Sequence, residues 1–149
     1  MTPLFKKNPL FFSFLFPAVL DGVVTLLGQD RSYWEISYRF ANEASPAYYI
    51  LAKHPALFAL GGAIWFIVLY LLFLKLKSPW NLMLAVAFVA GHAWGSSTWL
   101  WKFMRESNIY IIGNQNSITL AWTLIIFYFL LIGIIAGFFI SKYIEGTEL

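Results

Sequence analysis

The fold is decided by an apolar stretch near the start of the chain, residues 9–28, with the sequence PLFFSFLFPAVLDGVVTLLG. A helix of about 20 apolar residues crosses the roughly 30 Å of hydrocarbon in a bilayer. Three further stretches approach or exceed that length, so the sequence predicts four membrane-spanning helices. The predicted spans are residues 9–28, 55–74, 80–101 and 118–140.

The composition agrees with a membrane protein. The chain has 149 residues, of which 60% are hydrophobic and 11% charged, and its mean hydropathy is +0.72. These values are far too apolar for a soluble domain. We therefore expect one integral membrane domain over residues 1–149, with the all-α fold of a four-helix transmembrane bundle.

The composition also excludes several kinds of partner and site. The chain has no cysteine, so disulfides, thiolate metal sites and thiol catalysis are excluded. The formal net charge of +3 is spread among loops and tails without a basic run, so we expect no nucleic-acid partner. Nothing in the sequence indicates a cofactor.

The segment between the first two predicted spans is polar but aromatic. Aromatic rings mixed with charges in residues 30–45 are typical of chain at the level of the lipid headgroups. Residues 46–54 are expected to form a short interfacial helix, which Pro55 ends. With four crossings, both termini lie on the same side of the membrane. The lysine pairs Lys6/Lys7 and Lys75/Lys77 lie on that side and favour the cytoplasmic one.

Two ionisable side chains lie deep in these apolar stretches. Counted from Asn8 and Pro79, Asp21 and His92 are both thirteen residues along, roughly 20 Å at about 1.5 Å per residue. Since the first and third spans run in the same direction, the two side chains are expected at the same depth. Ionisable groups in hydrocarbon are costly, and they usually face a bundle interior, pair with one another and mark a working site.

A carboxylate beside an imidazole in a membrane has three physical uses. The pair can move a proton, receive the polar or cationic end of an amphiphile, or hold a metal if Glu43 or His54 joins it. Because helices supply only two of those ligands, we predict no metal site. The predicted ligand-binding residues are Asp21, Thr25, Glu43, His92 and Ser96.

Three functions remain open. The first is a polar pocket between the first and third spans that binds a membrane lipid or other amphiphile. The second is a non-catalytic accessory or scaffold subunit of a larger membrane complex or homo-oligomer, because the small-xxx-small pair Gly91 and Gly95 lets a further helix approach. The third, an intramembrane enzyme or proton-coupled carrier, has thin support, since no Gly-x-Ser-x-Gly motif is present. The sequence favours a non-enzyme and indicates no catalytic residue.

The first half of the chain resembles an uncharacterised family of small bacterial and archaeal membrane proteins, which implies no known activity. The resemblance rests on Leu20-Asp21, Thr25, Gly28, Asn42-Glu43, Pro46 and residues 48–51. An Asp in the first span, a long aromatic loop and a His in the third span are more distantly similar to the sigma-2 receptor and emopamil-binding group. That resemblance implies a pocket for sterol-like or cationic amphiphilic ligands. The chain departs from this group in its second span, where Gly61-Gly62 stand in place of an acidic residue.

Overall fold

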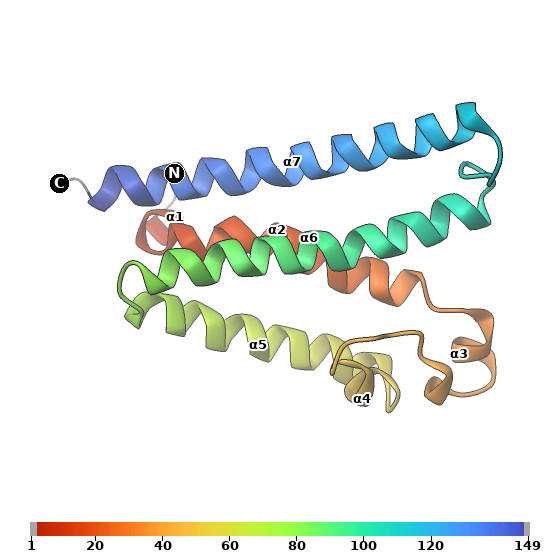
Figure 1. The fold of residues 1–149 in the computed structure, drawn as a ribbon. Coiled ribbons are helices and arrows are strands. Elements are labelled where there is room, and N and C mark those ends of the chain that lie inside the picture. The colour runs from red at the N-terminus through yellow and green to blue at the C-terminus, as the bar shows by residue number, and fades with distance from the viewer. Residues whose placement is uncertain (1–2, 148–149) are drawn as a thin grey trace.

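The computed structural model describes the backbone of residues 3–147. All the regular elements among these residues are helices, and loops connect them. Four long helices lie side by side, and the short ones belong to the chain start and to the first long loop (Figure 1). The elements are α1 (Pro3–Lys7), α2 (Pro9–Leu27), α3 (Arg31–Glu35), the 3-10 turn η1 (Tyr38–Phe40), α4 (Tyr48–Leu51), α5 (Pro55–Lys75), α6 (Trp80–Glu106) and α7 (Gln115–Thr147).

Three of the four long helices are long and apolar enough to cross a membrane: Pro9–Leu27, Pro55–Lys75 and Gln115–Gly146. The predicted all-helical fold and membrane class are therefore supported, whereas the fourth predicted span, residues 80–101, is not among these candidates. That stretch lies within α6, which has 27 residues, but its polar side chains make it less apolar than the others. The last helix also begins before and ends after the predicted residues 118–140.

The long helices alternate in direction. In Figure 1, α2 and α6 run one way and α5 and α7 run the other, so both ends of the chain lie at the same end of the bundle. We call this the terminal end and the opposite one the loop end. The parallel direction of α2 and α6 is what the sequence predicted for the helices that carry Asp21 and His92.

The first long helix is the centre of the bundle. α2 contacts α5, α6 and α7, and half of its apolar window is buried, against 11% for α5 and 17% for α7. The largest buried apolar cluster joins α2 to its neighbours in the terminal half of the bundle, where the Phe14 ring packs in tilted contact with Phe73 of α5 and Phe88 of α6. The outer surfaces of α5 and α7 are therefore left apolar and exposed, as suits contact with lipid.

Two of the long helices start at a proline, which lacks the backbone donor that a first turn leaves unpaired. At α5, His54 caps the helix, because its Nδ1 accepts from the Ala56 amide at 3.0 Å. At α2, Asn8 makes no such cap. Its side-chain amide instead donates to the carbonyl of Tyr70 at 2.9 Å, which ties the start of α2 to α5.

The loop between α2 and α5 is folded by internal hydrogen bonds. Gln29 is buried at the end of α2; its side chain accepts from the Asn42 amide at 2.7 Å and donates to the Asn42 carbonyl at 3.2 Å. Tyr33 is fully buried and donates to the carbonyl of Leu51 at 3.1 Å. Burial and the neighbouring Tyr38 raise the pKa of Tyr33. The short helix α4 lies within residues 46–54, where a short helix was predicted before the second span.

Candidate functional site

Asp21 of α2 and His92 of α6 meet side chain to side chain. The Asp21 Oδ2 atom lies 2.9 Å from Nδ1 of His92. The side chains are 21% and 27% exposed, respectively, so neither is sealed inside the bundle. Equal depth on parallel helices has thus produced the contact that the sequence predicted.

A glycine makes this approach feasible. A Cβ at Gly95 would lie 2.9 Å and 3.0 Å from the two carboxylate oxygens of Asp21, closer than real Cβ contacts. The Asp21 side chain therefore lies directly on the backbone of α6, at Gly95. Gly91 differs, because a Cβ there would have no described contact within 4 Å. Of the two glycines predicted to pack helices, Gly95 packs against α2, whereas Gly91 is exposed.

An aromatic wall adjoins the imidazole. The ring of Phe88, one turn before His92 on α6, stacks with it at 6.1 Å between centroids and 24° between planes. Phe88 also contacts Phe14 of α2 and Trp65 of α5. The Phe88 ring restricts rotation of the His92 imidazole and makes the surroundings apolar on the face of the imidazole that it covers.

One atom on each partner remains available. Asp21 Oδ1 and His92 Nε2 make no hydrogen bond to any described residue. Every fully buried side-chain nitrogen or oxygen among the described residues has a partner, so both atoms are reachable from outside the protein. An ionised Asp21 requires Nδ1 to donate, and in a neutral imidazole this leaves Nε2 as an acceptor. The pair then offers two acceptor atoms.

Next to the pair, Ser96 of α6 contacts the hydroxyl of Tyr128 on the fourth long helix, α7. Ser96, fully buried one turn after His92, donates from Oγ to the His92 carbonyl at 2.5 Å. Since that hydroxyl hydrogen is used, the contact with Tyr128 of α7 must be donated by the tyrosine hydroxyl. Tyr128 was not among the predicted site residues, although it is the one tyrosine in residues 118–140.

The other predicted ligand-binding residues lie apart from the pair. Thr25 is buried one turn beyond Asp21, and its carbonyl accepts from the Gln29 side chain at 2.8 Å. Glu43 accepts from the Ser45 amide at 2.7 Å within the loop. Within the described part of the chain, no hydrogen bond joins the side chain of either residue to that of Asp21 or His92. The structure brings together Asp21, His92 and Ser96, and it leaves Glu43 in its own turn.

A lysine at the loop end fixes α2 against α6. Lys102 Nζ donates to the carbonyl of Gly28 at 2.9 Å and pairs with Asp30 at 2.8 Å and Glu106 at 2.7 Å. Burial lowers the pKa of Lys102, but the hydrogen bonds and charges of Asp30 and Glu106 outweigh it and raise the pKa above 10.5. Beside it the Trp99 ring lies against Gly28, where a Cβ would be 2.2 Å from a ring carbon. These contacts set the register of the two helices.

No cluster of three or more metal-ligating side chains occurs among the described residues. His54 caps α5, and Glu43 is held in its turn. The two residues considered as additional ligands are thus used elsewhere in the fold.

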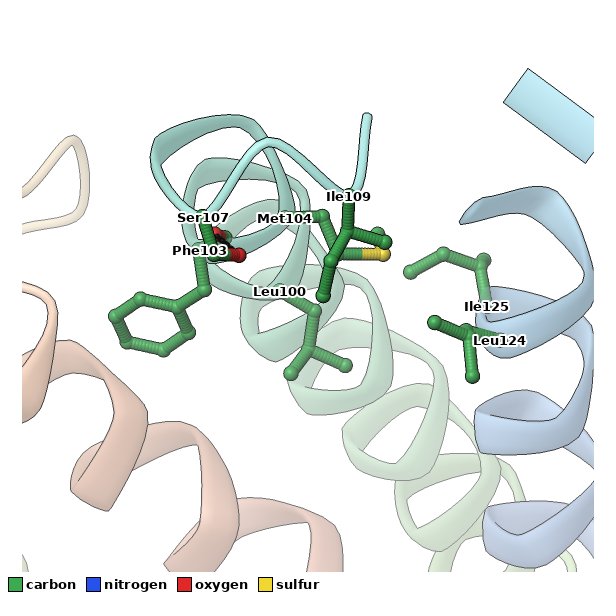
Figure 2. A pocket seen from close by; sticks show the side chains of 7 residues that line it. All are labelled: Leu100, Phe103, Met104, Ser107, Ile109, Leu124 and Ile125. Carbon is green, nitrogen blue, oxygen red and sulfur yellow. Dashed lines mark hydrogen bonds between the residues drawn. The ribbon is translucent and has the colours of Figure 1, made fainter. Parts of the chain in front are cut away.

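A separate hollow of about 260 Å³ opens between α6 and α7 near the loop end (Figure 2). It contains no member of the pair and no titratable group, and Ser107 is its only polar side chain. Leu100 and Leu124 lie one turn from Ser96 and Tyr128, on the loop side. The lining residues are Leu100, Phe103, Met104, Ser107, Ile109, Leu124 and Ile125. Since this hollow lacks convergent polar groups, the Asp21–His92 pair remains the better candidate site.

Comparison with known proteins adds no assignment, because no family model, curated protein or solved structure matches the chain.

Proposed function

We propose that the chain crosses a membrane four times and binds, at the Asp21–His92 pair, an amphiphile whose polar end donates hydrogen bonds. The fourth crossing is α6. Its 27 residues extend about 40 Å at 1.5 Å per residue, and α6 packs against α2 and α7. Its length and its place beside apolar helices support a crossing.

The polar side chains of α6 are compatible with that crossing. Ser97 and Thr98 donate to the carbonyls of Trp94 and Gly95 at 2.7 Å each. Ser96 is likewise bonded within its own turn. Hydroxyls that are satisfied by their own helix need no water, so they are tolerated at membrane depth.

The observation that carries the binding function is that Asp21 Oδ1 and His92 Nε2 make no hydrogen bond to any described residue. A carboxylate at this depth is costly unless it is paired, and here one of its two oxygens has no described partner. A ligand that supplies hydrogen-bond donors there relieves that cost. Alcohols and protonated amines supply donors, whereas carboxylates add a second negative charge beside the first.

The test uses three single-chain probes that share one tail: dodecylamine, dodecanol and dodecanoate. Each is added in small amount to the protein in phosphatidylcholine nanodiscs, and thermal unfolding is followed. The expected order of stabilisation is dodecylamine, then dodecanol, then dodecanoate, since the amine adds ionic attraction to its donors. The Asp21→Asn variant removes the charge and should lose the preference for the amine.

The matched control is Glu35→Gln, which removes an exposed acidic side chain of the loop and should keep the full order. If dodecanoate stabilises as well as dodecylamine, or if Asp21→Asn keeps the amine preference, the pair does not bind donor groups and the proposal fails.

A second candidate is the accessory subunit, and the exposure of Gly91 favours it. The open Cβ position of Gly91 lies beside the exposed Trp94, on a face of α6 that turns away from the bundle. A foreign helix would approach there. Gly91→Leu should then abolish co-purification of a partner in mild detergent without lowering the thermal stability of the chain alone. If every companion protein still co-purifies with Gly91→Leu, this face is not a subunit contact.

A further inference from the structure

The charged side chains outside the spans are unevenly divided between the two ends of the bundle. Among the described residues, the one acidic side chain at the terminal end is Glu145, which pairs with Lys142 at 2.7 Å. The other four lysines there make no ion pair with any described residue. The terminal-end lysines are Lys6, Lys7, Lys75, Lys77 and Lys142.

The loop end is close to balance. Lys102 is neutralised twice, by Asp30 and by Glu106. The side chains that remain at this end are four basic and two acidic ones, so the loop end as a whole carries a net charge of +1 by count. The loop-end charges are Arg31, Arg39, Lys53, Lys102 and Arg105 against Asp30, Glu35, Glu43 and Glu106. Each end has four basic side chains without a described ion pair, but among the described residues the terminal end has only one acidic side chain and the loop end has four, so the net positive charge is larger at the terminal end.

The fold brings the segments that carry the four lysines without an ion pair to the same end of the bundle. Phe5 of α1 packs on Phe12 of α2 and Phe139 of α7, with centroids 4.4 Å and 5.8 Å apart. This contact holds α1 against the terminal end of the bundle. Asn8 is hydrogen-bonded to the Tyr70 carbonyl, so the chain that follows α1 lies next to the last turns of α5. The turn from α5 to α6 lies at the same end in Figure 1.

We propose that this lysine face, defined as Lys6, Lys7, Lys75 and Lys77, binds the headgroups of anionic phospholipids. All four side chains are exposed and flank membrane-crossing helices, which places their ammonium groups at headgroup level. A basic residue near an anionic surface contributes enough attraction to raise binding about fivefold. The inference rests on the proposed membrane crossing, but it does not depend on the Asp21–His92 site.

The experiment measures lipid selectivity directly. The full chain is reconstituted with equal amounts of phosphatidylglycerol and phosphatidylcholine, released into mild detergent, and examined by native mass spectrometry for the lipids it retains. The wild type should retain phosphatidylglycerol preferentially. The variant with all four lysines changed to Gln should lower the ratio of the two retained lipids by at least about tenfold, since roughly fivefold per lysine compounds to several hundredfold if all four act on one lipid.

The matched control changes Arg31, Arg39, Lys53 and Arg105 to Gln, which removes the same number of charges from the loop end. Its lipid ratio should stay near that of the wild type. Inorganic phosphate at equal ionic strength should not replace the lipid, because an isolated ion lacks the membrane surface potential.

An equal loss of selectivity in the lysine and loop-end variants would show a net-charge effect and overturn the proposal, as would unchanged selectivity in the lysine variant. If the wild type shows no preference for dodecylamine but still retains phosphatidylglycerol preferentially, the binding site at Asp21 is refuted and the lysine face is not.

Discussion

Substitution of Gly95 by alanine tests how closely α2 and α6 approach at the pair. The added Cβ would lie 2.9 Å from Asp21 Oδ1 and 3.2 Å from its Cγ. Either the helices separate or the carboxylate turns away from His92. Overpacking typically costs about 1–3 kcal/mol, and loss of a hydrogen bond to a charged group costs about 1.5–3 kcal/mol. Both outcomes lower stability by a similar amount.

Gly91→Ala is the matched control, because the same substitution one turn earlier meets open space. Alanine favours a helix over glycine by about 1 kcal/mol at either position. The Gly95 variant should therefore be less stable than the Gly91 variant by about 1–3 kcal/mol, and each kcal/mol corresponds to roughly 2–4 °C in a chain of this length.

The assay is thermal unfolding in one detergent, repeated in an Asp21→Ala background. With the carboxylate removed, the penalty of Gly95→Ala should largely disappear, and the coupling energy should be of the size of the penalty itself. Equal stability of the Gly91 and Gly95 variants, or an undiminished penalty in the Asp21→Ala background, would show that Asp21 does not lie on Gly95.

The other contacts give three further predictions. Gly28→Ala should lower stability by about 1–3 kcal/mol because its Cβ would overlap the Trp99 ring, and Trp99→Ala should relieve part of that loss in thermal unfolding. Because the pKa of Lys102 is raised, its stabilisation is complete below about pH 10.5 and is lost as pH rises through the folded pKa. In a pH series the alkaline loss of stability should be smaller in Lys102→Met than in the wild type, and the loss that remains includes that of Tyr33, whose pKa is also raised. Tyr128→Phe should cost about 0.6 kcal/mol in the same assay, the average for a hydrogen bond between helices in a membrane, and should have no further effect when Ser96 is already alanine.

The contact between Asp21 and His92 was predictable because it depends on two regular quantities. Both residues lie thirteen positions from the starts of parallel helices, and the rise per residue is constant, so their depths agree. The proline-marked starts of α2 and α5 were also predictable. The direction of each helix followed from the number of crossings.

The side on which each residue points was harder to predict. Gly91 and Gly95 belong to one sequence pattern, yet only Gly95 faces α2, because the helix has turned by about 40° between them at 3.6 residues per turn. Tyr128 was missed because its height depends on where α7 begins, and that helix starts three residues before the predicted span. The bonds of Glu43 and Lys102 depend on the fold of irregular loops, which hydrophobic periodicity does not specify.

The most direct measurement of where Asp21 lies is disulfide formation in the Asp21→Cys/Gly95→Cys variant, because the natural chain has no cysteine. A cysteine Sγ at residue 21 would take roughly the place of Asp21 Cγ, which is 3.2 Å from the Cβ position of residue 95. The S–S bond length sets a separation of roughly 3 Å between the Sγ of one cysteine and the Cβ of the other. Mild oxidation should give an internal bond, seen as the loss of two hydrogens by mass spectrometry, and the Asp21→Cys/Gly91→Cys control should give none. Absence of the bond in the Gly95 variant, or equal bonding in both, would contradict the position of Asp21 on which the proposed binding site depends.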